Sequence, residues 1–130
     1  MRRPYIGGMS SPKVLIVGHN ADDAANLEVV ISAAGFAPLR AATAADAVER
    51  ARAVVPDVIL IDVVAPPTDG YETCRELQAD VAIRHIPVIV VSTRNQKGDQ
   101  LWARLQGASN LVAKSCAADE LVGAIRNALI

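Results

Sequence analysis

Aromatic residues are scarce in this chain, and neither sign of charge dominates it. Only 3% of its 130 residues are aromatic although 52% are hydrophobic, so its core must be built mainly from Ala, Val, Leu and Ile. Basic and acidic residues almost cancel, and the formal net charge is −1. A chain with this balance lacks the electrostatic attraction by which proteins bind nucleic acids and anionic membranes. We therefore expect no nucleic acid and no membrane among its partners.

Cysteine motifs, bilayer-length apolar runs and a signal peptide are also missing. Cys74 and Cys116 stand far apart and form no CxxC pair, which favours two reduced thiols over a disulfide or a zinc site. No apolar run is long enough to span a bilayer. Residues 1–12 lack the apolar stretch of a signal peptide and are expected to form a flexible tail, with Met1 and Met9 both candidate starts. Together these features favour a cytoplasmic protein.

Short apolar runs alternate with segments of helical periodicity along the rest of the chain. The runs cover residues 13–18, 37–41, 57–62, 87–92 and 110–114, and three of them are almost continuous Val, Ile and Leu. Such runs are typical of parallel strands that helices cover on both faces. Strands that alternate with helices indicate successive βαβ units. We therefore predict an α/β domain over residues 13–130, with a (βα)5 doubly wound, five-stranded parallel sheet.

Capping residues and periodic apolar positions predict where the helices lie. Asn20 and Thr43 are suited to cap the first two helices, and Gly35 is suited to end the first one. Three more helices are predicted after the PPTDG turn, before Gly107 and at the end of the chain. The apolar positions that indicate the five helices are Leu27, Val30, Ile31 and Ala34; Ala44, Ala47, Val48 and Ala51; Tyr71, Cys74 and Leu77; Leu101 and Leu105; and Leu121, Val122, Ile125 and Leu129.

Chemically capable side chains stand at the carboxyl ends of the predicted strands, where ligands collect in doubly wound folds. Asp62 ends the third strand, Ser92 ends the fourth, and Lys114 ends the fifth. A carboxylate can attack a phosphoryl group, a hydroxyl can donate to a phosphoryl oxygen, and an ammonium can neutralise developing charge. These three residues therefore predict a site that accepts a phosphoryl group.

The motifs around these residues resemble one family. The stretch PDVILIDVVAPPTDGYE has Asp62, Pro66, Asp69 and Gly70 in the pattern of response-regulator receiver domains. The stretches IPVIVVST and GASNLVAKS are similar to the fourth and fifth strands of that family. The resemblance implies a flavodoxin-like receiver fold and a phosphoprotein role in two-component, phosphorelay signalling.

The resemblance also implies roles and partners. Asp62 would be the phosphoacceptor, Ser92 and Lys114 would contact the phosphoryl group, and the protein would be no enzyme beyond autocatalytic acceptance of that group. A histidine kinase or a downstream signalling protein would meet the face of the fourth helix, fifth strand and fifth helix. The stretch STRNQKGDQLWARLQGASNLVAKS further resembles receivers of type IV pilus, or twitching-motility, chemosensory systems. Trp102 within it is expected to be a packing residue.

The sequence departs from the family at the end of the first strand. Gly18 and His19 stand where receivers carry the acidic pair that holds Mg²⁺. Mg²⁺ requires oxygen ligands, and Asp62 is the only typical ligand that remains, so we predict weak Mg²⁺ binding and assign no metal ligand and no cofactor. Asp22 and Asp23 come later, in the first turn of the predicted helix, where the helix dipole favours them. A water-mediated reach of one of them into the site is the alternative.

Three other positions are atypical or ambiguous. His19 has three interpretations: a tolerated polar residue, a protonated partner of Asp62, or a ligand for a softer metal such as Zn²⁺ or Ni²⁺. In many receivers an aromatic side chain on the fifth strand moves together with the hydroxyl of the fourth strand, here that of Ser92, when the domain is phosphorylated. Leu111 stands at that aromatic position, so we expect only a muted form of this coupling. Ser115 replaces the proline that usually follows the lysine, which predicts a trans peptide bond there.

The sequence therefore predicts a stand-alone, atypical receiver that works by docking to other proteins. The alternative is a pseudo-receiver with the same fold and docking face, whose signal requires neither phosphate nor Mg²⁺. A small flavodoxin-like enzyme or nucleotide-binding domain is disfavoured. The first strand is followed by GHNADD, which is not a glycine-rich phosphate loop.

Overall fold

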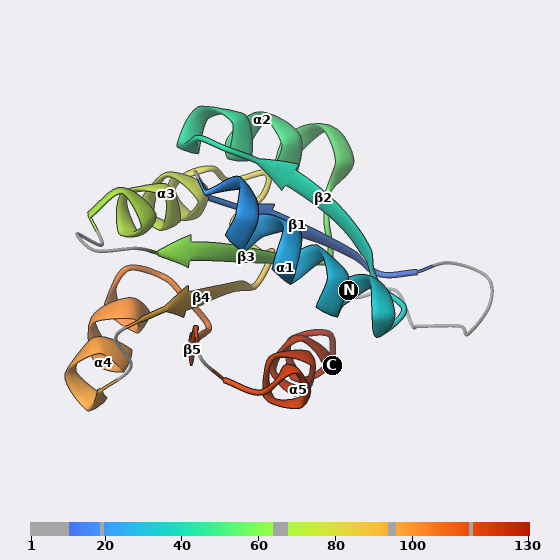
Figure 1. Cartoon of the computed structure of the whole chain (residues 1–130). Coiled ribbons are helices and arrows are strands. Elements are labelled where there is room, and N and C mark those ends of the chain that lie inside the picture. Colours follow the sequence, from blue (N-terminus) through green and yellow to red (C-terminus); the bar gives the residue numbers. More distant parts are fainter. Residues whose placement is uncertain (1–10, 19, 64–67, 94–95, 115) are drawn as a thin grey trace.

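The structure, a computed structural model, describes residues 11–18, 20–63, 68–93, 96–114 and 116–130. The expectations for residues 1–10, His19, Pro66 and Ser115 therefore lie outside the described residues. In the described part of the chain, strands and helices alternate (Figure 1): β1 (Lys13–Val17), α1 (Ala21–Ala33), β2 (Ala37–Ala41), α2 (Ala44–Val54), β3 (Val58–Val63), α3 (Thr68–Ala79), β4 (Val88–Ser92), α4 (Lys97–Leu105), β5 (Asn110–Ala113) and α5 (Ala118–Ala128).

The strands form one parallel sheet in the order β2-β1-β3-β4-β5. This order confirms the predicted doubly wound architecture. The direction of strand succession reverses next to β1, so the carboxyl ends of β1 and β3 lie at the topological switch point. That edge of the sheet is therefore where this fold places a site.

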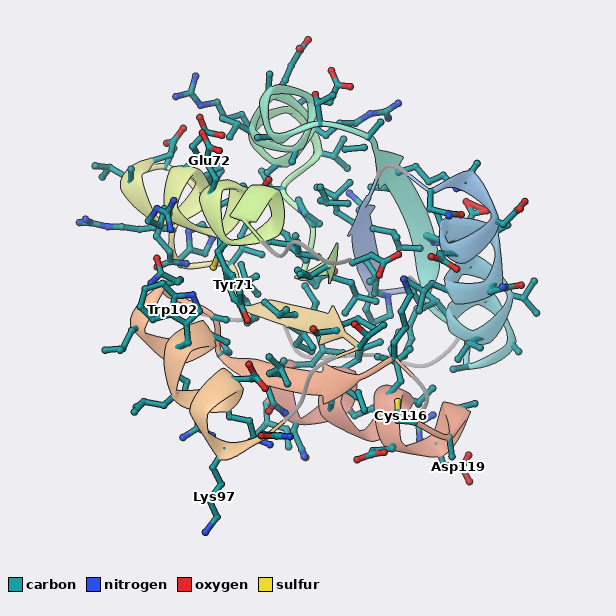
Figure 2. The ribbon with its side chains drawn as sticks, turned by 60° about the vertical axis from the view of Figure 1, so that its left-hand side comes forward. Tyr71, Glu72, Lys97, Trp102, Cys116 and Asp119 are labelled. Atoms are coloured by element: carbon teal, nitrogen blue, oxygen red, sulfur yellow. The ribbon has the colours of Figure 1, made fainter. Side chains whose placement is uncertain are left out.

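Helices cover both faces of the sheet, as Figure 2 shows. One core cluster lies between the sheet and α2, α3 and α4, and it contains Leu15 and Ile59. The other lies between the sheet and α1 and α5, and it contains Ile16 and Leu60. Neighbouring residues of a strand face opposite sides of the sheet. Because both sides are buried, the strands are nearly continuous runs of Val, Ile and Leu.

The predicted caps of the first two helices are confirmed. The side chain of Asn20 accepts a hydrogen bond from the backbone N–H of Asp23 at 3.0 Å, and Thr43 Oγ1 accepts one from the N–H of Asp46 at 3.1 Å. Gly35 follows α1 with a φ of +93°, a left-handed conformation that residues with a Cβ rarely adopt. The chain therefore leaves α1 at the residue that the sequence indicates.

Several element boundaries differ from the predictions. The third helix begins at Thr68, so the TDG of the expected turn is its first helical turn, and the prediction that this helix starts after the turn was wrong. A polar first helical turn and an isolated turn have the same composition, which is why the sequence did not separate them. The third and fourth strands, Val58–Val63 and Val88–Ser92, each begin one residue later than expected.

The fourth helix forms where the sequence predicts it, but its leucines face outward. Leu101 and Leu105 are 62% and 68% exposed, whereas Ala103 is fully buried against the sheet. The spacing of two leucines four residues apart indicates a helix but does not say which side the rest of the protein covers. In α4 the small residue faces the core and the large ones remain on the surface.

The two cysteines lie on opposite sides of the sheet. Cys74 belongs to the cluster under α2, α3 and α4, whereas Cys116 packs against the cluster under α1 and α5. Both are free thiols. The intervening sheet keeps them from forming an intramolecular disulfide.

The helices are short. The longest in the described part of the chain, α1, has 13 residues. A helix needs about 20 apolar residues to cross the hydrocarbon core of a bilayer. None of the described helices combines the length and apolar character for such a span.

Candidate functional site

The sheet brings the three predicted strand-end residues to one edge. Asp62 lies in β3 opposite Val91, and Val63 pairs with Ser92 of the neighbouring strand. The backbone N–H of Lys114, directly after β5, donates to the carbonyl oxygen of Ser92 at 2.7 Å. The pairing of adjacent parallel strands therefore carries a carboxylate, a hydroxyl and an ammonium to the same region, as the sequence predicts.

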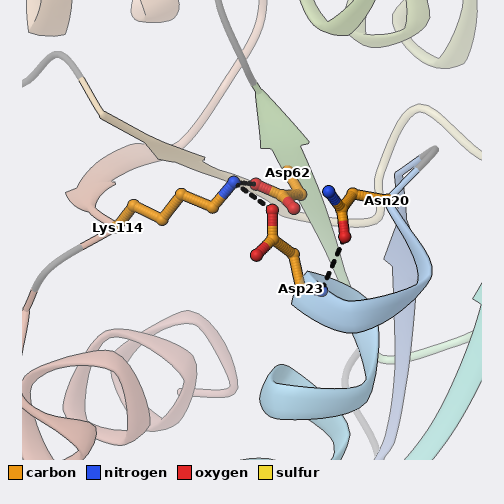
Figure 3. Close-up of polar contacts among 4 residues, drawn as sticks. All are labelled: Asn20, Asp23, Asp62 and Lys114. Carbon is orange, nitrogen blue, oxygen red and sulfur yellow. Dashed lines mark hydrogen bonds and ion pairs between the residues drawn. The ribbon is translucent and has the colours of Figure 1, made fainter.

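Lys114 is the centre of the polar contacts in this region, as Figure 3 shows. Its Nζ lies 2.9 Å from Asp62 Oδ1, and the contact is an ion pair. The same Nζ donates a hydrogen bond of 2.7 Å to Asp23 Oδ2. Lys114 therefore pairs with Asp62, and a second carboxylate shares the same cation.

Asp23 is the residue at this site that sequence reasoning undervalued. Both Asp22 and Asp23 lie in the first turn of α1, as predicted. The expectation that they act only on the helix dipole, or reach the site through a water, was wrong for Asp23, because its carboxylate contacts Lys114 directly. The signal was present: α1 starts within a few residues of the carboxyl end of β1, so one face of its first turn borders the site. Asp22 is exposed.

The three charged side chains of this site are buried to different degrees. The Asp62 side chain is only 2% exposed, and those of Lys114 and Asp23 are 22% and 31% exposed. Burial lowers the pKa of the Lys114 ammonium, but the hydrogen bonds and negative charges of Asp23 and Asp62 outweigh burial and raise that pKa above its usual 10.5. Lys114 is therefore a permanent cation at neutral pH.

The described residues do not fit the Mg²⁺ that the fold family implies. Gly18 offers no side-chain ligand, and a Cβ built on it would lie 3.1 Å from Asp62 Cβ, so the chain directly after β1 runs close against the Asp62 side chain. The ammonium of Lys114 already contacts that carboxylate. Within the described part of the chain, no three His, Cys, Asp or Glu side chains are grouped as a metal site requires.

The two positions expected to couple the site to the surface are both buried. Ser92 is 3% exposed and Leu111 is 6% exposed. Leu111 packs in the core cluster under α2, α3 and α4. The leucine therefore lies inside the fold on the side of α4, with no polar tip that could respond to a change of charge.

An apolar strip on α4 lies next to the third helix. Leu101, Trp102 and Leu105 form this strip, and Trp102 is 50% exposed. The rings of Trp102 and Tyr71 meet edge to face, with centroids 6.4 Å apart and an angle of 84° (Figure 2). Trp102 therefore packs, as expected, and also contributes to an exposed apolar surface.

Comparison with known proteins identifies the class. Residues 14–126 match the family described as the response regulator receiver domain, and the chain belongs to that family. It is 32% identical over 117 residues to Protein PilH of Pseudomonas aeruginosa, which covers 90% of this chain and 97% of PilH. It is 31% identical over 116 residues to the polar-differentiation response regulator DivK of Brucella ovis, covering 89% of this chain and 94% of DivK.

Solved structures agree with this assignment. A response regulator of Chloroflexus aurantiacus has a TM-score of 0.83 and 27% identity, covering 92% of this chain and 98% of its own. The chemotaxis protein CheY4 of Vibrio cholerae has a TM-score of 0.82 at 20% identity, and the match covers 92% of this chain and 99% of CheY4. At this identity the likeness shows the fold alone. The flavodoxin-like receiver fold and the family expected from the motifs are both confirmed.

Proposed function

We propose that this receiver domain accepts a phosphoryl group on Asp62, with Ser92 and Lys114 as the residues that hold it. The observation that carries the proposal is the pair formed by a carboxylate that is 2% exposed and an ammonium 2.9 Å away, at the switch point of the sheet. The ammonium can neutralise charge on the phosphoryl oxygens as they approach the carboxylate.

The proposed step is a simple transfer. One oxygen of Asp62 forms a bond to phosphorus while the bond from phosphorus to the donor breaks, and the donor leaves with that electron pair. The donor is a phosphorylated histidine of a kinase or a small acyl phosphate. Residues Ser92 and Lys114 contribute by positioning and by charge.

Weak dependence on Mg²⁺ is part of the proposal. Asp62 is the only typical oxygen ligand among Asp62 and Gly18, and Lys114 already provides a positive charge beside it. When bound in a receiver, the ion would screen charge between acceptor and phosphoryl oxygens. In this chain that screening depends mainly on Lys114.

The proposed partners are a histidine kinase and a downstream signalling protein. We propose docking at the face of α4, β5 and α5, and the exposed apolar strip of Leu101, Trp102 and Leu105 supports the part of α4 in this contact. The similarity to PilH supports a place in a pilus-related chemosensory pathway. The near-complete overlap with PilH and DivK supports a role like that of these two regulators.

A pseudo-receiver is the second candidate. Here the same face would carry a signal without phosphate. Gly18 at the strand end and Leu111 in the core favour it, because a ligand for Mg²⁺ and the aromatic switch residue are both replaced.

The test is incubation with acetyl phosphate, with and without Mg²⁺, followed by intact-mass measurement. A gain of one phosphoryl group that Asp62→Asn abolishes supports the proposal. A second variant, Gly18→Asp combined with His19→Asp, restores the missing acids. Labelling of that variant alone, and only with Mg²⁺, would favour the pseudo-receiver for the natural chain.

A further inference from the structure

We propose that Asp23 is a positioning residue that holds Lys114 and competes with the phosphoryl group for its ammonium. The inference rests on the proposed function of Asp62. Lys114 Nζ lies 2.7 Å from Asp23 Oδ2 and 2.9 Å from Asp62 Oδ1, so two carboxylates share one cation (Figure 3). The three residues come from the start of α1, from β3 and from the end of β5.

Asp23 is well placed to hold the lysine. Its own backbone N–H donates to the side chain of Asn20 at 3.0 Å, which fixes the first turn of α1 at the edge of the sheet. Its carboxylate accepts the hydrogen bond of Lys114 from a partly buried position, with 31% of its side chain exposed. A charge-assisted hydrogen bond in such surroundings is stronger than an exposed one.

A phosphoryl group changes the balance of charge at this cation. In the resting state one ammonium serves the two carboxylates of Asp23 and Asp62. A phosphoryl group brings roughly two negative charges near neutral pH. Lys114 would then be drawn toward the phosphoryl oxygens, and the Asp23 carboxylate would be left close to a group of the same sign. Asp23 therefore stabilises the resting arrangement and opposes the phosphorylated one.

The neighbouring residue gives a matched control. Asp22 lies in the same helical turn and has the same charge and the same favourable interaction with the helix dipole, but its side chain is exposed. Asp22→Asn and Asp23→Asn therefore remove the same charge from α1. Both keep the Asn20 cap, because Asn20 accepts from a backbone N–H.

The first measurement does not depend on phosphorylation. The rate at which the Lys114 ammonium exchanges its hydrogens with water is followed by nitrogen-15 NMR, with the signal assigned by its loss in Lys114→Gln. We expect Asp23→Asn to speed this exchange roughly tenfold, as loss of a charge-assisted hydrogen bond implies. We expect little change in Asp22→Asn. Equal rates in the two variants would overturn the positioning role.

The second measurement is the phosphorylated fraction at steady state with acetyl phosphate, by intact mass. We expect this fraction to be several-fold higher in Asp23→Asn than in Asp22→Asn and the natural chain. Faster ammonium exchange with unchanged labelling would overturn the competition. Absence of label in every variant would overturn the proposed function and with it the competition, while the exchange rates would still decide whether Asp23 positions Lys114.

Discussion

Lys114 Nζ lies 2.9 Å from Asp62 Oδ1, although the Asp62 side chain is only 2% exposed. A carboxylate buried to this extent requires a partner, because burial of an unpaired charge is costly. Lys114 supplies that partner from the position directly after β5, on the far side of β4 from Asp62. The functional proposal and the stability of the fold therefore depend on the same pair.

Removal of the lysine should destabilise the protein. In Lys114→Gln the Asp62 charge stays buried without its cation, and we expect the free energy of unfolding to fall by about 2–3 kcal/mol, a value reduced for the partial exposure of Lys114. Urea denaturation measures it. The double variant that adds Asp62→Asn to Lys114→Gln should recover much of the loss. The control Lys97→Gln, on the exposed start of α4, should change stability little. Equal losses in the Lys114 and Lys97 variants would contradict this account.

The buried thiol of Cys74 should make stability depend on alkaline pH. Burial raises the pKa of Cys74 from 9.0 to about 11, and the nearby charge of Arg75 only partly opposes this. The raised pKa means that the contribution of the neutral thiol is fully present below pH 9 and is lost as pH rises from about 9 to about 11. The expected slope is about 1.4 kcal/mol per pH unit over that window.

Cys74→Ala isolates this effect. We expect the variant to lose some packing energy at every pH but to lack the additional fall above pH 9, measured by urea denaturation from pH 7 to pH 10.5. Cys116→Ala is the comparison, because burial raises the pKa of that thiol too but the residue is only partly buried, so most of the fall above pH 9 should persist in this variant. A parallel pH dependence in the natural chain and Cys74→Ala would show that another group is responsible.

Two glycines should respond in opposite ways to alanine. Gly107 has a φ of +100°, and a Cβ there would lie 2.3 Å from Gln78 Cγ, so Gly107→Ala should cost about 2 kcal/mol. Gly123 lies within α5 with open space at its Cβ position, and Gly123→Ala should stabilise by up to about 1 kcal/mol. Thermal unfolding compares the two. Gly107→Ala combined with Gln78→Ala should remove the clash and leave the backbone cost.

Val55 stores backbone strain at the end of α2. It is the C-cap of that helix with a φ of +50°, a left-handed conformation unfavourable for a branched side chain, and it is 51% exposed. Val55→Asn should therefore stabilise the protein by about 0.5–1 kcal/mol, because asparagine tolerates this conformation. Val55→Ala removes the branch but lacks the short polar side chain that can hydrogen-bond locally in this conformation, so it should gain less. A loss of stability in Val55→Asn, measured by urea denaturation, would show that the valine side chain has a packing role.

Much of the fold was predictable because its signals are local. Continuous Val, Ile and Leu runs indicate strands buried on both faces, and the side chains of Asn20 and Thr43 cap the helices that follow them. The side of α4 that faces the core was not predictable. The Leu101 and Leu105 pattern indicates a helix, but only the packing of Ala103 against the sheet shows which side faces out.

The candidate site divides in the same way. The sequence by itself determined that Asp62, Ser92 and Lys114 meet, because parallel strands end at a common edge whatever surrounds them. Only the tertiary structure decided that Asp23 joins them, since that contact joins side chains 91 residues apart. It depends on the angle at which α1 leaves β1 and on the reach of one lysine. The local pattern places the first turn of α1 near the site, but it does not say which side chain of that turn reaches Lys114, because that geometry arises when two elements pack against the same sheet.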